Sequence, residues 1–447
     1  MKNVLHHEIR RNLLSSTISL MLSAPLALLT LAGKIFSPYY SGRAGAGLRD
    51  GFEPAVPTTM ISTAADDSSD ATPGHPRLGY TTAEQVDKVG GFLRTIGLTG
   101  GFAPLVVITG HGSSSENNPH RAAYDCGACS GRNSGPNGRL FASLANRPEV
   151  RDGLREQGID IPDDCWFIGA SHNTCDDAVD WFDLDAVPAA MQTALDKLRD
   201  EVNQTIERSA HERCRKFASA PRKLSRKAAL KHVIGRSTDF SQARPELGHA
   251  TNAAAFIGRR SNTQGAFFDR RVFLISYNPT TDPDGRIVEA ILLAAGPVGA
   301  GISLEYYFST VNNDRYGCGS KITHNVTGFL GVMEGASSDL RTGLPRQMIE
   351  IHEAMRLQVI VEAKIDILTE IYMRQPPLQE LVGKGWILLS AKDPDSEEIH
   401  VFDPESGWSR WDGKVSDLPR VRTSSDWYEG LMEPLTPALI DKEMAHA

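Results

Sequence analysis

A histidine and two cysteines, His111, Cys126 and Cys129, lie in one short stretch rich in glycine, serine and asparagine. Histidine nitrogen and cysteine thiolate are ligands that zinc prefers, and the glycines allow the chain to direct both toward one centre. The Cys-x-x-Cys spacing also occurs in structural metal sites and redox dithiols. A structural site needs a second Cys or His pair, which no segment supplies at the usual spacing, and Gly127 and Gly131 predict a loop rather than the helix of a redox dithiol. These residues alone leave a metal site and inert, packed thiols both open.

A second group contains His172, Cys175, Asp176 and Asp177, and it also follows an apolar segment. A turn in which an aspartate caps the following helix accounts for most of this group. Only His172 would then be unexpected, if it lines the same cleft as the first group.

Other patterns predict less. Arg315, Lys321 and His324 could bind a small anion, although a well-packed loop is the simpler account. The sequence contains no phosphate loop, dinucleotide fingerprint or serine nucleophile elbow. His211 and Glu212 are not followed by the second histidine of a zincin.

Both groups follow segments that the pattern predicts to be buried parallel strands, residues 104–109 and 165–170. Thr82 and Glu84 predict the start of a helix. Apolar residues at helical spacing predict further helices between the two strands and after them. Alternating strands and helices, with polar loops at the carboxyl ends of the strands, are typical of an α/β fold. Further elements are expected in VFLISYNP (272–279, a strand), the apolar stretch 286–309 (a buried helix), RLQVIVEA (356–363) and GWILLSAKD (385–393).

The composition indicates a folded chain of one large or two ordinary domains, with 40% hydrophobic and 23% charged residues among 447. A net charge of -8 argues against a nucleic-acid partner, because no broad basic field is available to neutralise phosphates. Six scattered cysteines predict a reducing compartment rather than a disulfide scaffold. We expect an apolar helical leader at 1–40, a linker at 41–79, an α/β region with the zinc half-site at 80–235 and a second α/β region at 236–447.

The leader contains the apolar segment 13–36, which follows Arg10 and Arg11. It is about long enough to span a membrane, but a buried or interfacial helix hairpin broken near Pro25 fits at least as well. No other stretch is expected to be as long as a spanning helix, so we expect membrane association to be peripheral or to run through a partner. The basic stretch 213–231 could touch an anionic lipid surface or an acidic partner, and a solvated helix face is the simpler interpretation.

Several long blocks of the sequence resemble the DabA family, the large subunits of two-component inorganic carbon transporters. They follow the family's order and cover nearly everything from Gly79 to Trp408. The blocks are GHGSSSENNPHRAAYDCGACSGRNSGPNGR, WFIGASHNTCDD, RPELGHATNAAAFIG, DPDGRIVEAILLA, EYYFSTVNNDRYGCGSKITHN and DLRTGLPRQMIEIHEAMRLQV.

The resemblance implies a fold with a β-carbonic-anhydrase-like core and additional α+β elements. In that family, zinc is held by two cysteines, an aspartate and a histidine, and the subunit associates with a cation-translocating membrane subunit of the DabB type. The implied function is energy-coupled hydration of CO2 to bicarbonate, on the cytoplasmic side of a bacterial inner membrane. The family's GHG histidine falls on His111 and its DCGAC cysteine on Cys126, so the resemblance predicts these two residues as Zn²⁺ ligands. Cys129 matches a family position that is not a ligand.

The family's other two ligands and an arginine come from an upstream Cys-x-Asp-x-Arg segment. The 447 residues contain no such segment, and neither Cys175-Asp176-Asp177 nor Cys214-Arg215 reproduces it. We therefore expect the fold and the zinc site to be incomplete without an upstream half, which another chain would carry. Carbonic-anhydrase-like activity is expected only if that chain supplies the missing ligands.

Two alternatives remain at this point. One is a free-standing zinc hydrolase that uses His111, Cys126 and His172. The other is a truncated, catalytically inactive interaction module that keeps the surface for the membrane partner. In any zinc site here, Asp125 or Ser113 could orient His111, because both are close to it or to Cys126 in the sequence.

Overall fold

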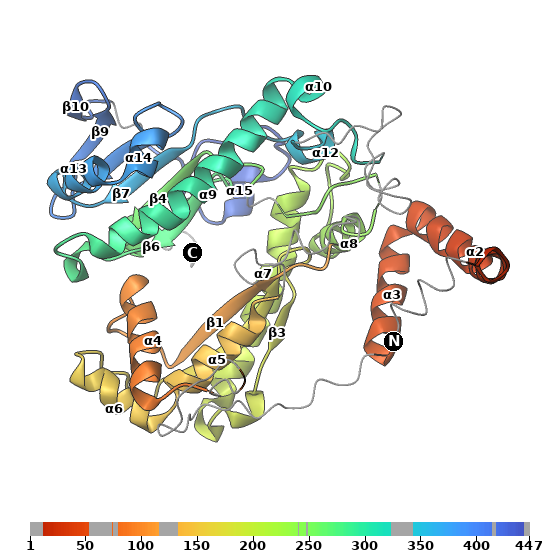
Figure 1. The fold of residues 1–447 in the computed structure, drawn as a ribbon, viewed down its shortest axis with the longest axis horizontal. Helices are drawn as coiled ribbons and strands as arrows, with labels where there is room; N and C mark the ends of the chain where they lie inside the picture. Colours follow the sequence, from red (N-terminus) through yellow and green to blue (C-terminus); the bar gives the residue numbers. More distant parts are fainter. Residues whose placement is uncertain are drawn as a thin grey trace.

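The computed structural model describes residues 12–52, 74, 79–115, 133–239, 241–246, 249–322, 343–413 and 417–441, with only the backbone described at 46 and 48–52. Cys126, Cys129, Asp125 and His324 therefore lie outside the described residues. In this part of the chain the fold is mixed α/β. Figure 1 shows a small sheet at one end, a larger sheet at the other, and α8 beside α7.

The small sheet contains the two strands predicted at 104–109 and 165–170. β1 (Leu105–Gly112) and β2 (Trp166–Asn173) are parallel, and β3 (Val179–Trp181) pairs with β2 in the antiparallel direction. Three helices pack beside this sheet, α4 (Thr82–Thr95), α5 (Gly135–Ala145) and α6 (Pro148–Glu156). Their apolar faces and the strands share one core, which includes Val89, Leu93, Leu154 and Phe167.

Both strands run further than their apolar residues indicate. β1 continues through Gly110 to Gly112, so His111 lies in the strand and not in the following loop. β2 likewise includes His172. The predicted helix cap at Asp176 and Asp177 is wrong, because a turn with Asp177 at φ 60° leads directly into β3.

The next two helices are α7 (Gln192–Cys214) and α8 (Arg226–Arg236), which pack against each other. Only part of the basic stretch 213–231 is a solvated face. Arg213, Arg215 and Lys216 are buried, where they pair with carboxylates.

The larger sheet has the strand order β10-β9-β8-β7-β4-β6 in the described part of the chain. The four neighbouring strands β8, β7, β4 and β6 are parallel to one another. Beyond β8, the strands β9 and β10 extend the sheet in antiparallel pairing. The strands are β4 (Ala254–Gly258), β6 (Val272–Ser276), β7 (Gln358–Glu362), β8 (Leu388–Lys392), β9 (Ile399–Asp403) and β10 (Gly407–Arg410). Strands in all three predicted segments 272–279, 356–363 and 385–393 are thereby confirmed.

Helices α9 (Arg286–Val311), α13 (Ile365–Arg374) and α14 (Pro376–Leu381) contribute to the core of this sheet, which includes Val288, Leu292, Val361 and Leu389. The remaining elements are short. They are β5 (Ala266–Phe267), β11 (Arg420–Val421), β12 (Ala438–Ile440), α10 (Asn313–Tyr316), α12 (Arg346–Ile349), α15 (Ser424–Tyr428) and 3-10 turns at Leu184–Ala186, Ala189–Met191, Arg260–Asn262 and Pro279–Thr281.

The apolar leader forms one helix, α2 (Leu13–Phe36), which passes through Pro25 without the predicted break. The chain turns at Ser37 into α3 (Pro38–Phe52), so the start of the expected linker is helical. Within the described residues, α2 and α9 are both long and apolar enough to cross a membrane. The expectation that no second stretch reaches this length is therefore wrong, although α9 packs partly on the larger sheet.

Helix α5 lies unusually close to the small sheet because Gly138 has no side chain. A Cβ atom at this position would stand 2.5 Å from the carbonyl oxygen of Ile108 and 3.2 Å from that of Ala170. The contact fixes α5 against both parallel strands just before His111.

We expect Gly138→Ala to lower the free energy of unfolding by about 2 kcal/mol or more, because the methyl group would collide with backbone atoms that cannot move independently. Gly91→Ala is the matched control, since a Cβ there meets no atom within 4 Å on the exposed side of α4. It should stabilise the chain by about 0.5 to 1 kcal/mol. Urea unfolding followed by circular dichroism measures both, and equal stability of the two variants would contradict the described packing.

Candidate functional site at the ends of two parallel strands

His111 and His172 lie side by side at the carboxyl ends of β1 and β2. The register of the parallel pair places His111 opposite His172 and Gly112 opposite Asn173. Residues in register on neighbouring strands point to the same face of a sheet, so both imidazoles emerge on one face. The structure thus brings together the histidines of the two predicted groups.

The loop that carries Cys126 begins and ends beside His111. The backbone N–H of His111 donates to Ser134 Oγ at 2.5 Å, and the N–H of Ser134 donates to the carbonyl oxygen of His111 at 2.8 Å. The chain that leaves β1 after His111 therefore returns to the same residue before α5 starts. Cys126 itself lies outside the described residues, so its predicted pairing with His111 stays a prediction.

A carboxylate that sequence reasoning missed, Glu246, joins these strand ends. Its Oε1 accepts hydrogen bonds from Ser113 at 2.8 Å, Thr174 at 3.1 Å and Cys175 at 3.2 Å. Its Oε2 is buried without a hydrogen-bond partner among the described residues. Burial, and then the negative charge of Glu246, raise the pKa of the Cys175 thiol well above its usual range. In this arrangement Cys175 is therefore a neutral hydrogen-bond donor near pH 7.

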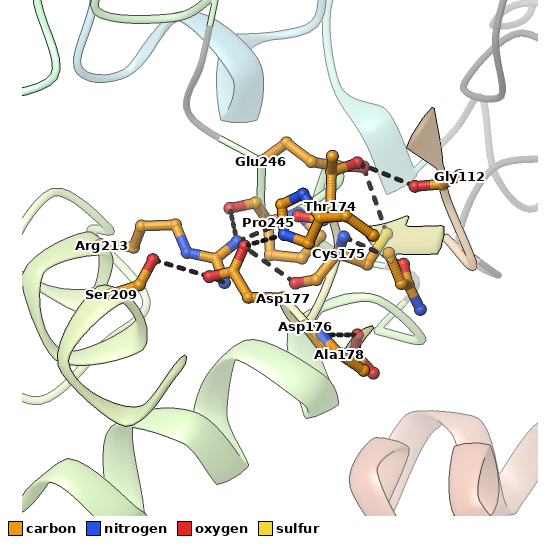
Figure 2. A network of polar contacts seen from close by, with 12 residues as sticks. Gly112, Thr174, Cys175, Asp176, Asp177, Ala178, Ser209, Arg213, Pro245 and Glu246 are labelled. Carbon is orange, nitrogen blue, oxygen red and sulfur yellow. Dashed lines mark hydrogen bonds and ion pairs between the residues drawn. The ribbon is translucent and has the colours of Figure 1, made fainter. Parts of the chain in front are cut away.

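Asp177 occupies a separate, cationic environment (Figure 2). One oxygen bonds His172 Nε2 at 3.0 Å, and the other accepts from Ser209 Oγ at 2.6 Å and Arg213 Nη2 at 2.7 Å. Burial acts to raise the pKa of Asp177, but the hydrogen bond from His172 and the charge of Arg213 outweigh it and bring the pKa to about 2. Asp177 is thus a carboxylate at any physiological pH.

Arg213 is the centre of this arrangement, with a side chain that is 2% exposed. Besides Asp177, it donates from Nη1 to the carbonyl oxygens of Thr174 at 3.3 Å, Cys175 at 3.2 Å and Pro245 at 3.1 Å. Figure 2 shows Arg213 of α7 between the turn after β2 and the segment that carries Glu246. One guanidinium therefore fixes both segments next to His172.

His249 is the third histidine near the strand ends. Burial, and then the nearby charge of Arg244, lower the pKa of His249 to about 4, and the proximity of His111 adds to this. His249 is therefore neutral near pH 7. It also lines an apolar cavity of about 300 Å³ between α9 and the larger sheet, together with Ile257 and Leu292. Nothing in its local sequence singled it out, although it belongs to the RPELGHATNAAAFIG block.

The described residues do not form a zinc site by themselves. Among them, no three His, Cys, Asp or Glu side chains are grouped so as to hold a metal ion. Cys175 and Asp177 have the Cys-x-Asp spacing, and Arg213 supplies a guanidinium in space. Their side chains nevertheless bind different partners, because Cys175 donates to Glu246 while Asp177 accepts from His172 and Arg213. His172, a ligand in the hydrolase alternative, already uses Nε2 for Asp177.

Comparison of the sequence with known proteins identifies a family. A sequence model described as "Probable inorganic carbon transporter subunit DabA" matches residues 1–387. Three similar proteins carry the same description. They come from Methylococcus capsulatus (60% identical, covering 98% of this chain and 41% of the relative), Dechloromonas aromatica (55%, 98% and 43%) and Nitrosococcus oceani (52%, 98% and 40%). The chain thus spans about two fifths of the length of these relatives. No solved structure matches the chain.

The low pKa of Asp177 predicts a specific acid sensitivity. A group whose pKa is lower in the folded state stabilises the fold above its unfolded pKa of about 3.8, and this stabilisation is lost as the pH falls toward 2. The difference between the two pKa values corresponds to about 2 kcal/mol in the free energy of unfolding. We expect Asp177→Asn to be less stable than the native chain at pH 6, and that difference to shrink by about 2 kcal/mol at pH 2.

Urea unfolding across this pH range provides the measurement. Asp180→Asn is the matched control, since it removes an exposed carboxylate three residues away, and its stability should run parallel to that of the native chain. A constant difference between the native chain and Asp177→Asn from pH 6 to pH 2 would show that Asp177 is not held by Arg213 and His172.

Proposed function

The chain belongs to the family of probable inorganic carbon transporter subunits DabA, and from this premise we propose that it forms part of an energy-coupled pump that hydrates CO2 to bicarbonate. The observation that carries the proposal is 60% identity to a DabA protein over 98% of the chain. The match to this relative covers nearly the whole chain, so the small sheet, α7 and the larger sheet all lie within the part of the chain that resembles it. The acting assembly is longer than these 447 residues, because the relatives are more than twice as long.

The proposed cofactor is Zn²⁺, held in part by His111 and Cys126 in a core of β-carbonic-anhydrase type. Two features of the chain support this role. His111 emerges at the carboxyl end of a parallel strand, the edge at which open α/β sheets bind ligands, and the loop that carries Cys126 is closed at His111 through Ser134. Bound zinc would supply hydroxide near neutral pH by lowering the pKa of a water ligand.

The remaining residues have supporting roles in this proposal. Ser134 holds the backbone of His111, and Arg213 fixes the turn next to it. The apolar cavity beside His249 offers an environment suited to CO2, which has no net dipole and is poorly hydrated. Glu246 and Asp177 give the surroundings of the site a fixed pattern of charge.

The missing ligands are proposed to come from a segment with Cys-x-Asp-x-Arg outside these 447 residues, on the upstream part of the family protein or on a separate chain. The proposed membrane partner is a cation-translocating subunit of the DabB type. The location is the cytoplasmic side of a bacterial inner membrane. The word "subunit" in the relatives' description supports an assembly of several chains.

Zinc content provides the test. We expect the chain purified alone to bind little zinc, because two protein ligands give only half of a tetrahedral site. Co-expression with a segment carrying Cys-x-Asp-x-Arg should give one zinc per complex, measured by elemental analysis. Cys126→Ser and His111→Ala should each remove that zinc.

Cys129→Ser and His172→Ala are the matched controls, and both should leave the zinc content of the complex unchanged. Full zinc in the isolated chain, lost in His172→Ala, would instead establish the self-contained hydrolase. Complete absence of zinc from the co-expressed complex would overturn the proposed chemistry and leave the interaction module.

A further inference from the structure

Helix α2 presents an unusually large apolar surface. Among its described residues none is buried, and Leu22 and Phe36 are 77% and 83% exposed. At 100° per residue, its large apolar side chains cover about two thirds of the circumference. Such a surface is far larger than a soluble protein leaves in contact with water.

Four hydroxyl groups of α2 form hydrogen bonds within the helix. The hydroxyl groups of Ser16, Thr17, Ser23 and Thr30 each donate to a backbone carbonyl oxygen three or four residues earlier. In water these bonds have little value, because solvent competes for both partners. In hydrocarbon no water is present, so a hydroxyl group without such a bond would be strongly unfavourable. The hydrogen bonding of α2 therefore suits a lipid environment.

The two ends of α2 differ in chemistry from its middle. Arg10 and Arg11 precede the helix in the sequence, and Lys34 is its only charged residue, in the last turn. Tyr39 and Tyr40 follow directly, and Tyr40 is 63% exposed. Cations and tyrosines at the ends of an apolar helix are typical of the membrane–water boundary. Between them, 24 residues extend about 36 Å, enough to reach deep into a hydrocarbon layer of about 30 Å.

The end of α2 is attached firmly to the body of the protein through α3 and α8 (Figure 1). Thr238 Oγ1 donates to the carbonyl oxygen of Pro38 at 2.7 Å. Lys231 Nζ donates to Tyr40 Oη at 3.1 Å and lies 5.0 and 4.7 Å from the centroids of the Tyr39 and Tyr40 rings. The basic segment of α8 is therefore held at the end of the apolar helix.

The segment 213–238, which contains the basic stretch and α8, carries exposed positive charge without any negative charge of its own. From residue 213 to residue 238 the sequence contains no Asp or Glu. Four of its cations are buried and paired with carboxylates, whereas five are exposed: Arg222, Lys223, Arg226, Lys227 and Lys231. One of the five, Lys231, contacts the residues that follow α2. Together these cations complement a surface of anionic lipid headgroups.

We propose that α2 inserts into the hydrocarbon layer of an anionic lipid bilayer and that the exposed cations between residues 222 and 231 bind the headgroups at its surface. This inference rests on the membrane location in the proposed function and adds direct contact between this chain and lipid. The exposed cations argue for lipid rather than for a covering protein domain, because a domain that covered these cations together with α2 would have to supply a matching carboxylate for each of them.

Flotation of the purified full chain with vesicles tests the inference. We expect the chain to float with vesicles of phosphatidylcholine mixed with phosphatidylglycerol, and less with phosphatidylcholine alone. Leu22→Asp should weaken binding more than about a hundredfold, because a carboxylate would enter hydrocarbon in place of leucine. The matched control is Met373→Asp on α13, which changes a residue that is 68% exposed outside this surface, and it should bind as the native chain does.

The charges are tested separately. Arg226→Glu with Lys227→Glu should weaken binding to phosphatidylglycerol vesicles by at least about thirtyfold. Lys197→Glu with Arg199→Glu makes the same charge change near the start of α7, outside the basic stretch. This control should have little effect on binding. Failure to float with either kind of vesicle, or flotation unchanged by Leu22→Asp, would overturn the inference and assign α2 to a protein partner. Zinc content of the co-expressed complex is measured independently, so this failure would leave the proposed chemistry standing.

Discussion

The buried guanidinium of Arg213 is the contact on which the candidate site depends. A buried cation is stable only if a carboxylate and several oxygen acceptors surround it, and Arg213 has Asp177 and three carbonyl oxygens. These acceptors belong to the turn after β2 and to the segment before Glu246. The hydrogen bonds of this one guanidinium therefore hold three parts of the chain together: α7, the end of the small sheet and the segment that leads to the larger sheet.

The same principle explains how the basic stretch divides. Arg215 and Lys216 share Asp269, and Arg236 pairs with Glu350, so each buried cation connects α7 or α8 to a distant segment. The sequence shows a run of cations, but it cannot show which of them have carboxylate partners, because those partners lie dozens of residues away. The cations of this one stretch therefore divide into two groups. One group is buried and stabilises the fold, and the other remains exposed.

The pattern of apolar residues in the sequence predicted most of the buried strands and helices. The apolar runs of β1, β2, β6, β7 and β8 identified strands, and α9 was expected as a helix. Their ends were harder to predict, because β1 continues through Gly110 and His111 only where pairing with β2 supplies the hydrogen bonds. Asp177 was mistaken for a helix cap, since an aspartate in a turn suits either a helix or, with a positive φ, a tight entry into β3.

The sequence predicts two candidate ligands, and that assignment stays a prediction, but it does not show the residues that surround them. His111 and Cys126 could be named from residue type and from their place in the long family blocks. Glu246 and Arg213 could not, because neither is near His111 in the sequence and each acts only after the fold brings it there.

The long connection between β1 and β2 also affects the order of assembly. His111 is synthesised 61 residues before His172 and 135 residues before Glu246, and pairing across such separations must first overcome the entropy of closing long loops. On the ribosome, β1 emerges while its neighbouring strand, its α7 anchor and its nearby carboxylate do not yet exist. The environment of His111 is consequently completed late in folding, after the small sheet, α7 and the segment to Glu246 have all been made.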